Sequence, residues 1–133
     1  MASKGHSFIV ASISRKIREL GYDITYVDGE SSDITRIKPK IPPKLINHKP
    51  DIIGENNLGN FCIGEAKTLN DLKSKRSRQQ FVDFYEFISL FEGNYLIIGI
   101  PSSALFELNK LLAKLNISGS SLIILQIPDI LLK

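Results

Sequence analysis

Three segments of the chain place apolar residues three and four positions apart, the spacing that puts them on one face of a helix. The apolar stripe of the first segment consists of Ile9, Ile13, Ile17 and Leu20. The stripe of the second consists of Phe81, Phe84, Tyr85, Ile88 and Phe91. The stripe of the third consists of Leu105, Leu108, Leu111, Leu112 and Leu115. The spacing predicts helices over residues 7–20, 78–91 and 102–115, the last of them capped by Ser102 or Ser103.

Shorter apolar runs between these segments predict strands. Three of the runs cover residues 22–27, 94–100 and 121–127. Two more lie on either side of a polar turn at residues 55–60, whose asparagines and glycines favour a β-hairpin. The expected order is αβββαβαβ, which is a single α/β domain over residues 1–133 with a central mixed β-sheet flanked by helices. Its last βαβ unit should be a right-handed crossover.

The composition is that of an ordinary globular domain. The 133 residues are 43% hydrophobic and 23% charged, which is enough for one good core. No apolar run approaches the ~18 residues of a membrane span. The first residues do not resemble a signal peptide, so we expect a cytoplasmic protein with no membrane association. Cys62 is the single cysteine and is expected to be a buried thiol.

Positive charge is concentrated in the first 78 residues, which hold 14 of the 17 lysine and arginine residues. Five of them occur from Arg36 to Lys49, where there is no acidic residue, and five more from Lys67 to Arg78. Such clusters fit a polyanionic partner such as nucleic acid, although lysine-rich loops can also serve only to keep a surface hydrated. Residues 30–49 contain three prolines and no clear period, so we expect this long loop to contact a substrate.

Candidate chemistry lies at the ends of the expected hairpin. Asp51 stands just before its first strand, and Glu65-Ala66-Lys67 closes the second. With the hairpin in register about its turn, Asp51 lies opposite Glu65, and opposed residues share one face of a sheet. Glu65 and Lys67 are two positions apart and share that face as well. The pattern therefore predicts that two carboxylates and an amine converge on one point, where they can bind a divalent cation.

Two features of the same strands bear on this prediction. The residues on the opposite face of the second strand, Cys62, Gly64 and Ala66, are small and would let a helix pack closely beneath the site. A simpler interpretation of the polar residues also exists, in which Glu65 and Lys67 form an ion pair at a sheet edge. In that interpretation Asp51 is a turn former after Pro50.

The spacing of these residues resembles a known family. Pro50-Asp51, a gap of thirteen residues and Glu65-Ala66-Lys67 resemble the motif of the PD-(D/E)xK nuclease superfamily, which has a restriction-endonuclease-like fold. Within that superfamily the chain looks similar to archaeal Holliday junction resolvases and their small relatives. The segments that carry this similarity are Lys4-Gly5, Arg18 to Tyr22, Gly29 to Ser32 and Gln79-Gln80. The resemblance covers residues 4–100, and the last helix and strand fit as generic additions.

The resemblance implies a metal-dependent DNA endonuclease that hydrolyses phosphodiester bonds. Asp51, Glu65 and the backbone carbonyl of Ala66 would hold Mg²⁺, which Mn²⁺ can replace, because hard cations prefer oxygen ligands. Lys67 would orient the attacking water or stabilise charge on the phosphorus. The products implied are a 5′-phosphate and a 3′-hydroxyl.

Further residues acquire roles from the same resemblance. Gln80 would contact the scissile phosphate or a metal-bound water; Gln79 is the alternative, and a capping or surface role fits either one. The expected nucleic-acid-binding residues are Lys49, Lys73, Lys75, Arg76, Arg78, Ser31 and Ser32. Phosphate contacts position a substrate but do not read its sequence, and no zinc-finger or helix-turn-helix pattern is present. We therefore expect cutting that is directed by DNA structure or by a partner.

One position departs from the family pattern. The resolvases carry a glutamate near the start of the first helix that completes the metal site, whereas Ile9 and Val10 stand there in this chain. His6 could substitute as a ligand, although a solvated N-terminal histidine is the simpler interpretation. Glu30, in the loop after the first strand, is the better candidate for an additional acid.

Three functions are consistent with the sequence. The first is a junction-resolvase-like endonuclease that cuts branched or duplex DNA as a homodimer, with the apolar residues 121–132 at the interface. The second is a nuclease-fold module with weak or no catalytic activity that binds nucleic acid and acts with a partner. The third is a structural subunit whose basic patches bind another protein.

Overall fold

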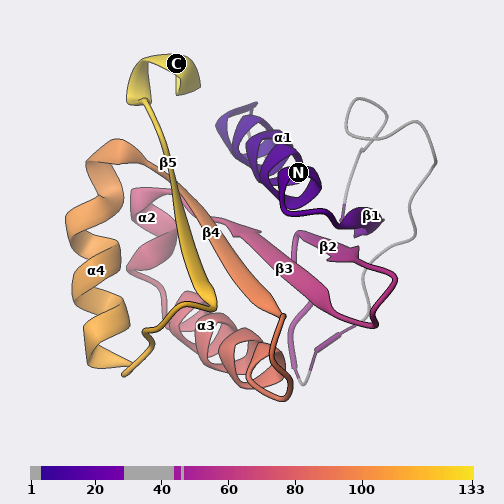
Figure 1. Cartoon of the computed structure of the whole chain (residues 1–133). Helices are drawn as coiled ribbons and strands as arrows, with labels where there is room; N and C mark the ends of the chain where they lie inside the picture. Colours follow the sequence, from indigo (N-terminus) through magenta and orange to yellow (C-terminus); the bar gives the residue numbers. More distant parts are fainter. Residues whose placement is uncertain (1–3, 29–43, 46) are drawn as a thin grey trace.

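A five-stranded mixed β-sheet forms the centre of the computed structural model, which describes residues 4–28, 44–45 and 47–133. Its strands are β1 (Asp23–Val27), β2 (Ile52–Glu55), β3 (Phe61–Ala66), β4 (Tyr95–Pro101) and β5 (Leu122–Ile127). They lie side by side in the order of the sequence (Figure 1). The pairs β1–β2 and β2–β3 are antiparallel, whereas β3–β4 and β4–β5 are parallel. The predicted strand bounds differ from these by one residue at most.

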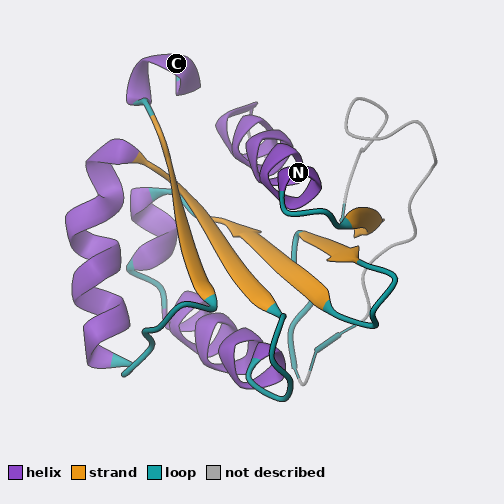
Figure 2. Ribbon diagram, viewed as in Figure 1, coloured by secondary structure: helices purple, strands orange, loops and turns teal. Residues whose placement is uncertain are grey.

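Helices cover both faces of the sheet (Figure 2). Helix α1 (Lys4–Glu19) lies on one face, and α2 (Leu69–Leu72), α3 (Lys75–Ile88) and α4 (Leu105–Lys114) lie on the other. The residues of each strand alternate between two cores, so Ile52 belongs to the core under α1 and Ile53 to the core under α3 and α4. This architecture confirms the expected α/β domain. None of the helices in the described part of the chain is long and apolar enough to cross a membrane.

The hairpin has the register that the sequence predicts. Ile52 pairs with Gly64 and Ile53 with Ile63. The side chain of Asn56 closes the turn by accepting hydrogen bonds from the N–H groups of Leu58, at 3.0 Å, and Asn60, at 2.9 Å. Because side chains alternate between faces, a slip of one residue would move the whole apolar set of β2 to the wrong core.

Helix α1 packs on three glycines that lie on three adjacent strands. A Cβ atom built on each of these glycines would lie only 2.4–2.6 Å from an isoleucine side chain of α1. The contacts pair Ile17 with Gly54, Ile13 with Gly64 and Ile9 with Gly99. The apolar stripe of α1 therefore packs on a track of glycines, which lets the helix approach the sheet closely. The small residues of β3 predicted this close approach.

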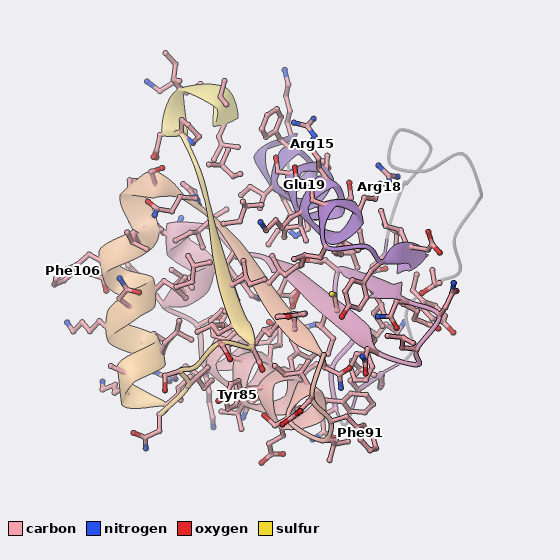
Figure 3. All side chains as sticks on the ribbon, in the orientation of Figure 1. Arg15, Arg18, Glu19, Tyr85, Phe91 and Phe106 are labelled. Carbon is pink, nitrogen blue, oxygen red and sulfur yellow. The ribbon has the colours of Figure 1, made fainter. Side chains whose placement is uncertain are left out.

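The helix boundaries differ from the prediction where polar caps decide them. Helix α3 begins at Lys75 rather than at residue 78, because the Ser74 hydroxyl accepts a hydrogen bond from the N–H of Ser77 at 3.1 Å. It ends at Ile88, so Phe91 lies beyond it and is 69% exposed (Figure 3), contrary to its place in the predicted apolar stripe.

The short helix α2 was not predicted. Thr68 and Asp71 form a capping box around its first turn, in which each side chain accepts a hydrogen bond from the other residue's N–H group. The prediction that Ser102 or Ser103 caps the last helix is wrong. These serines begin a 3₁₀ turn before α4, and Ser103 instead binds Asp129, with its N–H 2.9 Å and its hydroxyl 2.5 Å from the carboxylate.

The close approach of α1 predicts the effect of one added methyl group. We expect Gly64→Ala to lower the free energy of unfolding by about 1–3 kcal/mol, because the new Cβ would lie 2.5 Å from both Ile13 and Ile52. Urea denaturation followed by circular dichroism measures the change. Gly5→Ala is the matched control, since a Cβ there meets only Leu132 at 3.7 Å or more, an ordinary contact. Equal stability of the Gly64 variant and the wild-type protein would contradict the packing argument.

Candidate active site

The hairpin brings Asp51 and Glu65 together. Asp51 precedes β2 by one residue, and its Oδ2 atom accepts a hydrogen bond from the N–H of Ala66 at 2.8 Å. Glu65 is the penultimate residue of β3 and is 2% exposed. The two carboxyl groups are close enough for each to shift the pKa of the other. The site therefore begins with two acidic groups that are held in contact at the end of two paired strands.

Lys67 and Gln80 complete the polar cluster on this side. Lys67 follows β3 and is 8% exposed, and its Nζ atom donates a hydrogen bond to Oε1 of Gln80. Gln80 is on α3 and is itself 5% exposed. Of the two glutamines left open by the sequence, Gln80 is the one that faces Lys67, and Gln79 is exposed. Sequence spacing did not distinguish the two, because both lie near the start of the helix.

His6 is a partner of Asp51, so the interpretation of His6 as a solvated residue is wrong. Helix α1 begins at Lys4, three residues before the predicted start, and places Nε2 of His6 3.3 Å from Oδ2 of Asp51. Ile9 and Val10, the positions at which the family resemblance implied an acid, are buried in the core under α1. The first helix therefore contributes an imidazole to the site rather than a carboxylate.

Burial and mutual contact move the pKa values of the two acids in opposite directions. Burial raises the pKa of Glu65 well above its usual value, and the charge of Asp51 and the hydrogen bond with Asp51 raise it further. Burial also acts to raise the pKa of Asp51, but hydrogen bonds with Glu65 and His6 outweigh it and hold that pKa below its usual value. Without a cation, the pair therefore retains a proton to a higher pH than two isolated carboxyl groups would.

The hydrogen bond with Asp51 also raises the pKa of His6 above its usual value, while burial opposes this change. A positively charged imidazole beside Asp51 stabilises the ionised form of that carboxylate. The ionisation states of three groups, His6 on α1, Asp51 before β2 and Glu65 on β3, therefore depend on one another.

The residues present fit a divalent cation. The Oε2 atom of Glu65 is buried and has no hydrogen-bond partner in the part of the chain that the structure describes. In an extended strand the N–H and C=O groups of one residue point to the same side, so the Ala66 carbonyl lies on the side of Asp51. These are oxygen ligands, the type that Mg²⁺ and Mn²⁺ prefer.

The protein ligands are few, however. Within residues 4–28, 44–45 and 47–133, no group of three or more histidine, cysteine, aspartate or glutamate side chains is placed to hold a metal ion. A magnesium ion usually keeps several waters and takes ligands from substrate phosphates, so two carboxylates and one carbonyl suffice for such a site.

The expected nucleic-acid-binding residues fall into three groups. Lys49, Lys73 and Arg76 are exposed on the surface. Lys75 and Arg78 are also exposed and line a pocket on the outer side of α3, together with a histidine–aspartate pair that was not predicted. Ser31 and Ser32, together with Glu30 and most of the loop expected to contact a substrate, lie outside the described residues.

Comparison with known proteins adds little to this geometry. No protein-family model and no curated protein matches the chain. A solved structure of an EndoMS–dsDNA2 complex matches it with a TM-score of 0.42 and 14% identity, over 96% of this chain and 46% of that one. The chain thus spans about half the length of that protein. The function is therefore inferred from the chemistry of the site.

The pKa of Glu65 predicts how stability depends on pH when cations are removed by a chelator. In the unfolded chain Glu65 ionises near its usual value of 4.5, whereas the folded protein resists this ionisation. Stability should therefore fall as pH rises from 4.5 towards the pKa of the folded state. The loss of charge on His6 adds a further decline only above its usual value of 6.5. We expect Glu65→Gln to abolish the decline between pH 4.5 and 6.5, as measured by urea denaturation. A decline of the same size in the variant would show that other groups cause it.

Proposed function

We propose that the protein is a metal-dependent nuclease that hydrolyses phosphodiester bonds of DNA. The observation that supports this function best is the contact of Asp51 with Glu65 beside a buried Lys67. Burial of two acids and an amine costs free energy, and a site that binds a cation and a phosphate would account for all three groups. Enclosure of Glu65 and Lys67 in the core argues against a simple ion pair at an exposed sheet edge.

In this proposal, Asp51, Glu65 and the Ala66 carbonyl hold the cation, Mg²⁺ or Mn²⁺. When bound, the cation would polarise a phosphoryl oxygen and lower the pKa of a bound water. The N–H of Ala66 fixes the orientation of the Asp51 carboxylate through the hydrogen bond of 2.8 Å. His6 supports the ionised state of Asp51 from the other side of the site.

Lys67 is the residue that we expect to act on the substrate. Its ammonium group can orient the attacking water and stabilise the negative charge that develops on the phosphorus. Gln80 holds Nζ in place through its amide oxygen, so the amine does not have to find its position during the reaction. Water forms the new bond to phosphorus, and the bond to the 3′-oxygen breaks, leaving a 5′-phosphate and a 3′-hydroxyl.

The substrate in this proposal is branched or duplex DNA, recognised by its shape. The exposed basic residues would contact the phosphate backbone, which fixes position without reading sequence. We also propose a homodimer, since cutting both strands of a duplex or junction needs two sites. Strand β5 is an edge of the sheet, and Ile130 and Leu131 beyond it are 77% and 52% exposed, which would suit such an interface.

A second candidate function rests on the first helix. Because Ile9 and Val10 are buried where resolvases carry a metal-binding acid, the site has one carboxylate fewer than theirs. The chain could then be a nuclease-fold module that binds nucleic acid without efficient cleavage and acts with a partner.

Replacement of Lys67 separates the two candidates. We expect Lys67→Ala to lower the rate of Mg²⁺-dependent DNA cleavage by about 10²–10³-fold, because the variant loses the charge that stabilises the transition state. Cleavage of labelled linear, nicked, flapped and four-way junction DNAs is the measurement. Lys110→Ala is the control, since Lys110 is exposed on α4 and far from the motif in the sequence. If the wild-type protein and Lys67→Ala are equally inactive but both bind DNA, the binding module is the correct function.

The cation itself can be tested without activity. We expect Mg²⁺ to raise the thermal denaturation midpoint of the wild-type protein at neutral pH, because a bound cation supplies the missing partner of the buried Glu65 oxygen. Glu65→Gln should lose this shift while it remains folded. A shift of equal size in the variant would place the cation elsewhere on the protein.

A further inference from the structure

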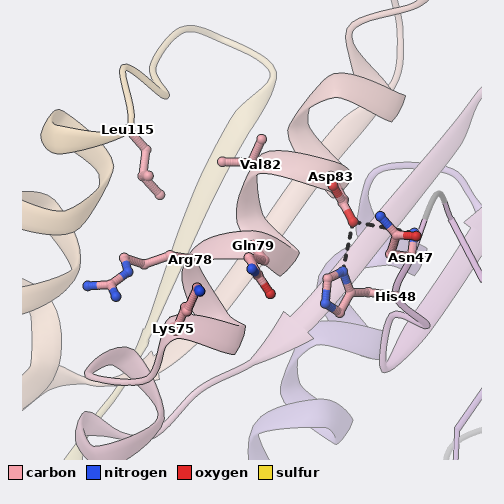
Figure 4. Close-up of a pocket in the computed structure, with 8 residues that line it drawn as sticks. All are labelled: Asn47, His48, Lys75, Arg78, Gln79, Val82, Asp83 and Leu115. Carbon is pink, nitrogen blue, oxygen red and sulfur yellow. Dashed lines mark hydrogen bonds and ion pairs between the residues drawn. The ribbon is translucent and has the colours of Figure 1, made fainter.

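A pocket of about 560 Å³ lies along α3 (Figure 4), and neither Asp51 nor Glu65 is among the residues that line it. Helix α3 contributes one wall through a stripe of residues three and four positions apart, the spacing of a single helix face. This stripe consists of Lys75, Arg78, Gln79 and Val82. Leu115, at the end of α4, lies on one side of the stripe, and Asn47 and His48 lie on the other (Figure 4).

The pocket carries a positive charge at one end. Lys75 and Arg78 are exposed there, and within the described residues neither forms an ion pair with a carboxylate. Both belong to the first turns of α3, where the helix dipole adds partial positive charge. An anionic group would be attracted to this end by the charges of Lys75 and Arg78 and by the dipole of α3.

At the other end, the structure holds His48 in one orientation. Nδ1 of His48 lies 2.7 Å from Oδ2 of Asp83, and the ring packs edge-on against Phe84 at 6.5 Å between centroids. An ionised carboxylate can only accept, so Nδ1 is the donor and Nε2 is left as the available ring nitrogen. No hydrogen bond to Nε2 is formed among the residues that the structure describes. The N–H of Asn47 also donates to Asp83, at 3.4 Å, which ties the preceding residue to α3.

We propose that this pocket is a phosphate-binding subsite for a DNA strand, formed by Lys75, Arg78 and His48. A strand there could place one phosphate against the two cationic side chains and a neighbouring phosphate beside His48, whose ring is oriented by Asp83. Asp83 is thus a positioning residue, and its own charge is already engaged by His48 and Asn47.

The position of the pocket relative to Lys67 favours a nucleic-acid strand as its occupant. Gln79 lines the pocket, and Gln80, the next residue of α3, binds Lys67 in the proposed active site. The two sites therefore lie on either side of one helix, and a strand cut beside Lys67 would continue over α3. This inference rests on the proposed nuclease function for the identity of the strand. The pocket's own charge supports an anionic occupant independently.

Binding measured without cleavage tests the subsite. In buffer with a chelator, the anisotropy of labelled four-way junction and duplex DNA gives the dissociation constant at several salt concentrations. We expect the double variant Lys75→Ala/Arg78→Ala to bind at least roughly tenfold more weakly. Its plot of log affinity against log salt should be shallower by about 1.8, the value for two lost phosphate contacts.

The matched control removes the same amount of charge from the opposite face of the sheet. Arg15 and Arg18 are exposed on α1 (Figure 3), so Arg15→Ala/Arg18→Ala should change affinity by less than about twofold. Equal losses in the two double variants would show that binding depends on overall charge, and the subsite would be wrong. Unchanged binding by Lys75→Ala/Arg78→Ala would also overturn it and point to an acidic protein partner.

His48 provides the more specific readout. We expect His48→Ala to weaken DNA binding by several-fold, because the variant loses the imidazole that Asp83 orients in the pocket. Asp83→Asn keeps an acceptor for Nδ1, so it should retain most of the binding that Asp83→Ala loses. If the charge of Asp83 only repels DNA, both Asp83 variants should bind DNA more tightly than the wild-type protein. That result would contradict the role of His48.

The outcome is separable from the proposed catalytic function. If the protein cuts DNA, the pocket variants should raise KM and leave kcat within about twofold, since they lose interactions made equally in the ground and transition states. If no cleavage is found but Lys75→Ala/Arg78→Ala still loses binding, the nuclease proposal fails and the subsite stands. If the protein cuts DNA but the pocket variants do not change KM, the subsite proposal fails and the nuclease proposal stands.

Discussion

The register of β2 against β3 is the constraint on which the rest of the structure depends. It sets Asp51 beside Glu65 and Ala66, and it also decides which apolar side chains enter which core. Both consequences come from the same alternation of faces, so the site cannot shift without the cores shifting too. The stability of the sheet, supplied by apolar burial on both sides, therefore fixes the position of polar groups that would otherwise repel each other.

The site lies where the layers of the fold meet. Helix α1 supplies His6 from one face of the sheet, and α3 supplies Gln80 from the other. Between them, the ends of β2 and β3 present the carboxylates and Lys67. Each polar group is held by at least one contact to a different element, which limits the side-chain freedom that a reaction would otherwise have to remove.

The sequence predicted the parts of this arrangement that depend on local periodicity. Alternation along β2 and β3 and the Asn/Gly turn were enough to place Asp51 opposite Glu65. The sequence did not place His6, because the apolar stripe from Ile9 to Leu20 does not show that α1 begins as early as Lys4. It missed the His48–Asp83 pair because the two residues are 35 positions apart, on a loop and on α3. Ser102 and Ser103 resemble helix caps, but Asp129, close only in space, competes for the hydroxyl of Ser103.

The track of glycines under α1 has a consequence for how this chain can change over time. A Cβ atom gained at Gly54 would lie 2.4 Å from Ile17, so Ile17 or the helix that carries it would have to shift. The same helix places His6 beside Asp51. A substitution between apolar layers could in this way disturb the contact of His6 with Asp51 while every polar residue of the motif stayed in place. Inspection of the motif alone would therefore not reveal such a change.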